Sequence, residues 1–230
     1  MKKIQTELES ARSSEKLFPF EKEYTHIIAA LRQTGISTLR ALKLFLGKTI
    51  GFIWGTEIIY EYLLKMPIEE IEPKIKVTIR TAVEDDLDKF KGIVNEKKIK
   101  LFRKRFKEDR MCFIALHQEN IVYFGWISFD DEYESIFQIM VKVNDKEAYW
   151  FDCRALPKYR RNRLHSVVTA KVLIYLKDKG FKKVLTHVMK DNIYSRKAFK
   201  KLGFKEKRMV TLIKIFNFKH YTYRDFKGKL

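Results

Sequence analysis

Residues 148–180 constrain the fold more than any other part of the chain, because a strand, a cationic turn and a helix follow one another directly. The aromatic and apolar run AYWFDCRAL is closed by Pro157 and predicts a buried strand. The turn KYRRNR then places three arginines within four positions. Asn162 is a candidate N-cap for a helix of about 15 residues that ends at Gly180. Because a helix start presents unpaired N–H groups and a positive dipole end, this turn predicts an anionic, phosphate-bearing ligand.

A second strand and a second, shorter helix follow this unit. The run FKKVLTHVM predicts the strand, and Asp191 and Asn192 can cap the helix, which Gly203 stops before Phe204 begins another strand. The order of strand, Pro157–Arg160, helix, strand, Asn192–Ser195, helix and Leu202–Phe204 resembles the acetyl-CoA-binding core of the GNAT superfamily of N-acyltransferases. About residues 75–217 can be laid on that fold. The resemblance implies an α/β (α+β) fold, with a mixed, mostly antiparallel central sheet flanked by helices.

The same resemblance implies which residues meet the cofactor, acetyl-CoA. Backbone N–H groups around Cys153–Ala155 would polarise the thioester carbonyl. Arg160 would bind the pyrophosphate, and Asn192 and Ser195 would meet the pantetheine arm. Further backbone contacts to the phosphates would come from Arg161, Asn162, Arg163, Leu164 and His165. As alternatives, surface arginines can simply coat the protein, and Asn192 can be a plain helix cap.

The chain departs from the family pattern at three positions. Arg163 and His165 occupy positions of the pyrophosphate loop where relatives carry small residues, often glycine. Phe199 stands seven residues after Asn192, where relatives that protonate the leaving thiolate carry a tyrosine. A thiol with a pKa of roughly 8.5 can leave as the thiolate near neutral pH, so this replacement is compatible with activity.

The general base and acid are less clearly marked. Asp152 lies within the cofactor strand, where a carboxylate is costly unless it is satisfied or lines a cleft, and it is the leading candidate base. Glu134 and its neighbour Glu132 are alternatives, as is His187, although a single strand histidine is more often a hydrogen-bonded core residue. Tyr194 is a candidate substitute for the missing acid. No spacing of His, Cys, Asp or Glu predicts a metal site, and no nucleophilic triad is apparent.

The charge of the chain is strongly asymmetric. Residues 1–73 hold 10 Lys and Arg against 10 Asp and Glu, residues 74–153 hold 15 against 15, and residues 154–230 hold 23 against 4. Coenzyme A phosphates account for a few of these cations. The rest can steer an anionic acceptor, hold the protein near acidic lipid or nucleic acid, or lie on solvated faces.

The segment before the family-like region divides into three parts. Residues 1–20 predict a frayed end, and residues 21–46 predict two amphipathic helices, which can pack on the protein or lie on a membrane surface. The run GFIWGTEIIYEYLL favours a strand, predicted to join the main sheet at its edge. Residues 67–73 then read as a linker, which gives an N-terminal helical extension over 1–73 and an acyltransferase domain over 74–230.

The remaining elements continue the sheet. IKVTIRTA predicts its first strand, residues 86–94 and 96–106 predict helices that shape the acceptor site, and RMCFIAL with IVYFGWISF predicts a hairpin. DDEYES predicts a loop, IFQIMVKV another strand, and KEKRMVTLIKIFNF a long strand with Val210 and Leu212 inward. The basic, aromatic tail predicts a final strand or a solvated end.

Cysteine content and hydropathy bound the compartment. Cys112 and Cys153, the two cysteines of the chain, lie in apolar surroundings and predict reduced thiols and a cytoplasmic location. No signal-peptide pattern begins the sequence, and no run of about 18 uncharged apolar residues predicts a membrane span.

The sequence therefore predicts an acetyl-CoA-dependent N-acyltransferase in which a primary amine attacks directly within a ternary complex. The resemblance implies an amino-sugar acceptor of a surface polysaccharide pathway. Two alternatives stay open: an enzyme or module that docks on nucleic acid through the basic C-terminal third, and a non-catalytic module that has kept the fold but lost the cofactor.

Overall fold

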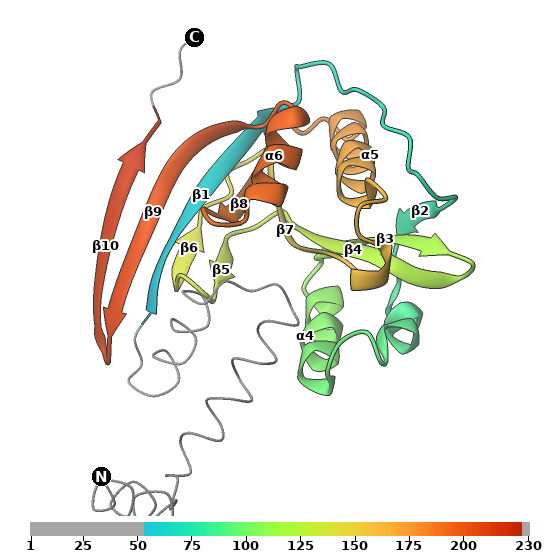
Figure 1. Cartoon of the computed structure of the whole chain (residues 1–230), viewed down its shortest axis with the longest axis horizontal. Helices are drawn as coiled ribbons and strands as arrows, with labels where there is room; N and C mark the ends of the chain where they lie inside the picture. The colour runs from blue at the N-terminus through green and yellow to red at the C-terminus, as the bar shows by residue number, and fades with distance from the viewer. Residues whose placement is uncertain (1–52, 227–230) are drawn as a thin grey trace, which may run out of the picture. The chain divides into compact units, whose positions relative to one another are not determined.

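A computed structural model describes residues 53–226, and eight strands in this part of the chain form one sheet in the order β10-β9-β1-β8-β7-β4-β3-β2 (Figure 1). The sheet strands are β1 (Ile53–Leu63), β2 (Thr78–Thr81), β3 (Met111–His117), β4 (Asn120–Ser128), β7 (Glu147–Ala155), β8 (Lys183–Met189), β9 (Lys205–Ile215) and β10 (Phe218–Asp225). The short strands β5 (Glu132–Glu134) and β6 (Ile139–Val141) form a separate hairpin. β7 pairs with β8 in parallel, whereas β1–β8, β2–β3, β3–β4 and β4–β7 are antiparallel, which confirms the mixed, mostly antiparallel sheet.

Two 3-10 helices and three α-helices accompany the strands among the described residues: η1 (Glu84–Phe90), α4 (Glu96–Lys107), η2 (Pro157–Tyr159), α5 (Leu164–Asp178) and α6 (Ile193–Lys201). Helix α5 has the length predicted for it and is followed by Gly180 at φ +79°. Helix α6 is capped by Asn192, whose side chain accepts from the N–H of Ser195 at 3.2 Å.

The described residues divide into two compact units. The smaller contains residues 53–54 and 213–220, where the ends of β9 and β10 meet at a turn with Phe216 at φ +51°. The larger contains residues 55–212 and 221–226, and all the candidate site residues lie in it.

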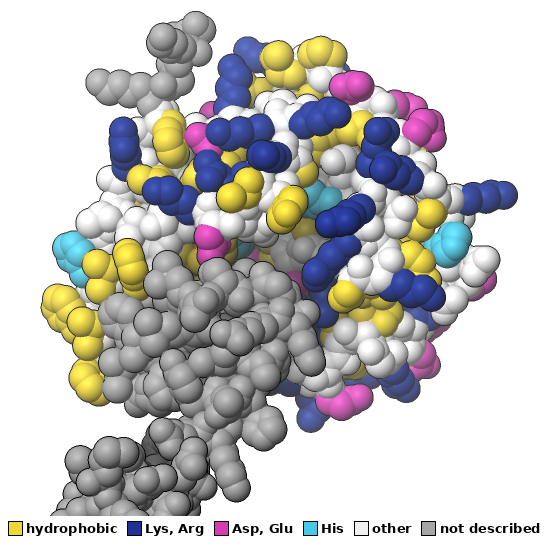
Figure 2. Space-filling view, viewed as in Figure 1, with side chains coloured by type: hydrophobic (Ala, Val, Ile, Leu, Met, Phe, Trp, Pro, Cys, Tyr) yellow, Lys and Arg dark blue, Asp and Glu magenta, His cyan; other side chains and the backbone are white. Residues whose placement is uncertain are grey.

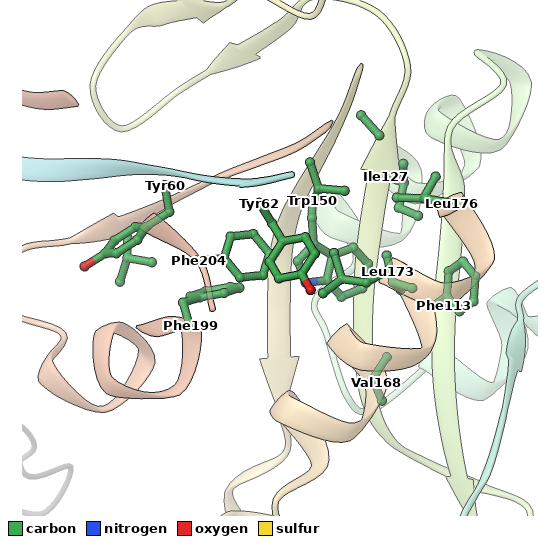
Figure 3. Close-up of a cluster of buried hydrophobic side chains, with 14 of the residues drawn as sticks. Tyr60, Tyr62, Phe113, Ile127, Trp150, Val168, Leu173, Leu176, Phe199 and Phe204 are labelled. Atoms are coloured by element: carbon green, nitrogen blue, oxygen red, sulfur yellow. The ribbon is translucent and has the colours of Figure 1, made fainter. Parts of the chain in front are cut away.

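In the larger unit, helices cover both faces of the sheet. On one face, Leu164, Val168 and Val172 of α5 and Phe199 of α6 pack on side chains such as Tyr60, Tyr62 and Trp150 (Figure 3). On the other, Phe90 of η1 and Phe102 of α4 pack on Phe124 and Trp126 with ring centroids 5.0–5.6 Å apart. These two faces are called the α5 face and the α4 face below. Alternating strand residues supply the two cores, as for the buried Phe113 and Ile114 of β3.

A β-bulge interrupts the pairing of β4 with β7. Phe124 pairs with Arg154 and Trp126 with Phe151, so Asp152 and Cys153 together oppose Gly125. Asp152 has φ +48° at this point. A bulge re-aims the side chains that follow it, and here it places Asp152 on the α4 face, beside Phe151, where plain alternation would have turned it away.

Several local predictions are corrected by the structure. The strand predicted at the sheet edge, β1, lies inside the sheet between β8 and β9. The helix expected over 86–94 is the 3-10 helix η1, DDEYES contains β5, and IFQIMVKV contributes only the three residues of β6, outside the main sheet. Asn162 does not cap α5; Arg163 takes that position. The hairpin of β3 and β4 and the burial of Val210 and Leu212 are confirmed, while residues 1–46 lie outside the described part.

Candidate functional site

The parallel pairing of β7 and β8 stops after the first three of the nine residues of β7. Its register runs from Glu147 with Lys183 to Tyr149 with Leu185. From Trp150 to Ala155, β7 stays paired with β4, while β8 continues along β1 from Thr186 to Met189. The facing edges of β7 and β8 therefore separate in the middle of the sheet, and this opening in the hydrogen-bonded ladder is called the split. Its edges carry backbone N–H and C=O groups without a strand partner among the described residues, and such groups can bind an extended ligand.

The arginine turn begins where β7 ends. The amide of Asn162 donates to the carbonyl oxygens of Tyr159 at 3.1 Å and Arg160 at 3.4 Å, which closes the turn. Arg161 and Arg163 have φ values of +67° and +61°, a left-handed conformation that favours glycine. Arg163 thus adopts the backbone expected of the small residue that relatives carry there. Helix α5 begins at the next residue, so its free N–H groups face the turn.

Cations lie at this helix start. Arg160, Arg161 and Arg163 are exposed. Helix α6 carries the exposed Lys197 and Lys200, and Lys200 pairs with Glu206 at 2.9 Å. Figure 2 shows Lys and Arg side chains gathered over α5, α6 and the turn between β7 and α5. Within residues 53–226, none of the three arginines of the turn forms an ion pair with a carboxylate, so their charge is available for an anionic ligand.

His165 and Phe199 fill the space between α5 and α6. The Nδ1 atom of His165 lies 2.7 Å from the hydroxyl of Tyr123, and its ring meets that of Phe199 edge-on at 4.7 Å. Burial lowers the pKa of His165 to about 4, so the imidazole is neutral at neutral pH. Phe199 is 3% exposed and also packs on Phe204, which makes it a core side chain. Tyr194, by contrast, is 87% exposed at the start of α6, beside Asn192 and Ser195.

On the α4 face, Asp152 is held by two cations. Lys98 Nζ lies 2.7 Å from one carboxylate oxygen and Arg105 Nη1 lies 2.7 Å from the other. The Arg105 guanidinium also lies 4.7 Å from the Phe151 ring centroid. Both oxygens of Asp152 are thus engaged by donors of helix α4.

Glu134 and Glu132 lie on the β5–β6 hairpin. The Glu134 carboxylate accepts from the N–H groups of Ile136 and Phe137 and so caps the turn of the hairpin. Glu132 pairs with Arg110 at 2.6 Å. Each of these carboxylates, like Asp152, has a partner.

A further set of polar side chains crosses the α4 face at the split. Tyr149 of β7 hydrogen-bonds the Nδ1 atom of His187 on β8, and His187 Nε2 lies 3.9 Å from Glu57 Oε2 on β1. Glu57 is 1% exposed, and neither of its oxygens accepts a hydrogen bond from the described residues. Burial, followed by the charge of Glu134, raises the pKa of Glu57 to about 8. Sequence reasoning did not single out Glu57, although a carboxylate inside an apolar, β-branched run was a usable signal.

The two cysteines do not offer a nucleophile. Both are free thiols, and burial raises the pKa of each well above its ordinary value. Since the thiolate is the reactive form, an acyl-cysteine intermediate is disfavoured at both positions.

Neither a metal cluster nor a membrane-spanning helix is present in the described part of the chain. Within residues 53–226, no group of three or more His, Cys, Asp and Glu side chains is arranged to hold a metal ion. No helix over the same residues is long and apolar enough to cross a membrane.

The model of the acetyltransferase (GNAT) family matches residues 79–204, more than half of the chain. The chain therefore belongs to this family of acetyltransferases. No curated protein matches the sequence.

Two solved structures share the fold at low sequence identity, and a third is similar at a lower TM-score. A Drosophila protein from structural genomics has a TM-score of 0.53 at 11% identity over 76% of this chain and 56% of its own. A GNAT-family acetyltransferase from Colwellia psychrerythraea has a TM-score of 0.52 at 14% identity, over 70% and 56% of the two chains. An aminoglycoside N-acetyltransferase in complex with CoA has a TM-score of 0.45 at 20% identity, over 56% and 92%. The match spans only 56% of the length of the first two proteins.

Proposed function

We propose that this protein transfers the acetyl group of acetyl-CoA to a primary amine of a small molecule, by direct attack within a ternary complex. The observation that carries the proposal is the split between β7 and β8, which opens beside an arginine turn and a helix start. A thioester needs a polarised carbonyl and a place for its phosphates, and these two features supply both within one stretch of chain.

The residues of this stretch take the roles that the resemblance assigns. Arg160, with the backbone N–H groups from Arg161 to His165, binds the pyrophosphate, while Asn192 and Ser195 meet the pantetheine arm. Backbone N–H groups between Cys153 and Ala155 polarise the carbonyl. The amine nitrogen forms a bond to the carbonyl carbon, and the carbon–sulfur bond breaks to release the thiolate.

The acceptor class, the compartment and the domain division are parts of the same proposal. We take an amino sugar as the acceptor class, as the family resemblance implies, and the cytoplasm as the location, since two free thiols fit a reducing compartment. Residues 74–230 are proposed as the acyltransferase domain and residues 1–73 as an extension that contributes strand β1 to the sheet of that domain.

Calorimetric titration with acetyl-CoA tests the proposal. Arg160→Ala removes a charge at the phosphates and is expected to weaken binding by about tenfold, the value of roughly 1.4 kcal/mol. Arg103→Ala is the matched control, because Arg103 is half exposed on α4 and contacts Glu84 at 3.7 Å, away from the arginine turn. The control should bind acetyl-CoA as the wild type does. Absence of acetyl-CoA binding by the wild type at moderate salt would overturn the proposal.

The rival function, docking on RNA, has one observation in its favour: 23 Lys and Arg against 4 Asp and Glu in residues 154–230. Strongly salt-dependent binding of a single-stranded RNA, together with no affinity for acetyl-CoA, would favour that reading.

A further inference from the structure

Glu57 is the one acidic side chain of the α4 face near the split that lacks a compensating partner among the described residues. Asp152 has Lys98 and Arg105, Glu132 has Arg110, and Glu134 has two backbone N–H groups. Glu57 is 1% exposed and, among the described residues, has only the Nε2 atom of His187 within 4 Å as a possible cation. A buried carboxylate without a partner is costly, so its retention needs a reason outside stability.

The position of this carboxylate in the sheet is informative. His187 comes two residues after Leu185, the last residue of β8 that pairs with β7, so it lies on the edge of the split. Glu57 is on the adjacent strand, where it pairs with Met189 and lies diagonally from His187 on the same face. The acid therefore lies one strand away from the opening at which the thioester is proposed to bind.

His187 lies between the Tyr149 hydroxyl at Nδ1 and the Glu57 carboxylate at Nε2. Burial, with the charges of Glu57, Glu134 and Glu132, raises the pKa of Tyr149 well above its ordinary value, and its hydroxyl shares a hydrogen bond with His187 Nδ1. Burial also lowers the pKa of His187, against the raising effect of Glu134 and Asp152. His187 Nε2 faces Glu57 Oε2 at 3.9 Å, so the neutral tautomer with its hydrogen on Nε2 suits a carboxylate at that position and leaves Nδ1 to accept from Tyr149. Neither oxygen of Glu57 accepts a hydrogen bond from residues 53–226.

Building on the proposed acetyl transfer, we infer that Glu57 and His187 form the amine subsite, where Glu57 binds the primary ammonium group of the acceptor and takes its proton. The substrate class is thus a cationic primary amine. His187 Nε2 faces the carboxylate at 3.9 Å, and the hydrogen bond to Tyr149 holds His187 in place. Asp152, with both oxygens held by cations, is less suited to this role.

The proton and bond changes of the step balance. The ammonium gives one proton to the Glu57 carboxylate and becomes a neutral amine with a free lone pair. The nitrogen forms its bond to the acetyl carbon, the carbon–sulfur bond breaks, and the departing thiolate takes the second proton from nitrogen. Glu57 returns its proton to solvent, so the products are the acetamide, CoA thiol and one proton. A base whose pKa is near the working pH is the effective one for this task.

Infrared titration of the carboxyl groups tests the subsite without knowledge of the true acceptor. Wild type minus Glu57→Gln isolates the Glu57 band, which is expected to titrate near pH 8. Ethylamine, used as the smallest probe, should lower the pH at which this band titrates by about one unit, because an ammonium stabilises the carboxylate. Ethanol should leave it unchanged. An unaltered titration in ethylamine would overturn the inference.

Kinetics on glucosamine, neamine and putrescine provide the second readout. Glu57→Gln is expected to lower kcat/KM by about 100-fold and to remove the rise in rate with pH up to about 8. Glu57→Asp keeps a carboxyl group and should keep the pH dependence at a lower rate. Glu61→Gln is the matched control on the same strand, since Glu61 contacts Lys207 at 3.6 Å and should retain the wild-type rate.

The outcomes separate this inference from the proposed function. Acetyl-CoA binding by Glu57→Gln equal to that of the wild type shows an intact fold and cofactor site. If that variant also keeps the rate and its pH profile, or if the wild type acetylates none of the three amines, the subsite is wrong while acetyl-CoA binding still stands. Absence of acetyl-CoA binding by the wild type would instead overturn the proposed acetyl transfer itself.

Discussion

The two faces of the sheet at the split are built in opposite ways. On the α5 face, the polar groups come from one stretch of chain, from Arg160 to Ser195, and most are exposed. On the α4 face, Glu57, Glu134, Tyr149 and His187 come from four strands and are largely buried. The exposed α5 face suits a large polyanion that stays partly hydrated when bound. The buried α4 face suits a single small charged group. Affinity for phosphate groups on the α5 face therefore depends on the sum of several charges. Affinity for an ammonium group on the α4 face depends on the environment of one carboxylate, that of Glu57.

The largest expected effect concerns that carboxylate and the pH dependence of stability. The pKa of Glu57 is about 8 in the folded protein against the usual 4.5, so the folded state binds a proton that the unfolded state releases between these values. Stability is therefore lost as pH rises from about 4.5 through about 8, by up to roughly 5 kcal/mol at 1.36 kcal/mol per unit. Urea unfolding of wild type and Glu57→Gln at pH 5 and pH 8.5 measures the difference.

The other titratable groups are present in both wild type and Glu57→Gln, so their contributions cancel in the difference between the two free energies of unfolding. Glu61→Gln, on the same strand, should follow the wild-type curve. Parallel pH curves for wild type and Glu57→Gln would mean that the carboxylate is solvated, and the contrast between the two faces would disappear.

A smaller loss of stability is expected from a substitution at Gly125, the β4 residue that lies opposite the bulge in β7. A Cβ atom there would lie 2.3 Å from Cη2 of the Trp150 ring, which is fully buried on the α5 face. Gly125→Ala should therefore cost about 2 to 3 kcal/mol in free energy of unfolding and loosen the bulge that aims Asp152 at α4.

Gly92→Ala separates this clash from backbone strain. Gly92 has φ +79°, and a methyl group added there would meet no described atom within 4 Å, so only the conformational cost of about 1 kcal/mol applies. Equal losses for the two variants in denaturant unfolding would show that Trp150 can move aside.

The smallest expected change in the free energy of unfolding is in the arginine turn, and it has opposite signs at Arg160 and Arg163. Arg163 has φ +61°, so Arg163→Gly relieves strain and should stabilise the fold by up to about 1 kcal/mol. Arg160 has φ −60°, so Arg160→Gly only adds freedom to the unfolded chain and should cost about 0.5 to 1 kcal/mol. Thermal unfolding resolves the pair, and a loss of stability in both would contradict the strain at Arg163.

The α5-face site comes from one stretch of chain and the α4-face residues come from several strands, and this difference explains what could be predicted from sequence. The strand, turn and helix from Ala148 to Gly180 are local, because periodicity, Pro157 and the glycine stop suffice to place them. The strand character of β1 was also readable, but its place inside the sheet depends on long-range pairing with β8 and β9. Asp152 was noticed as a charge in a strand, yet its partners on α4 depend on a bulge that leaves no pattern in the sequence. Glu57 became a candidate only when folding brought it to His187, 130 positions away in the chain.

The interior position of β1 has a practical consequence. A protein beginning at residue 74, where composition places the domain boundary, would lack the strand that β8 and β9 share. Strands β8 and β9 would then expose edges with unpaired N–H and C=O groups, and strands of other chains could pair with these edges. Such a fragment would contain the whole region that the family model matches and is still expected to aggregate. The family core of this protein is thus protected from aggregation by a strand that comes before it in the chain.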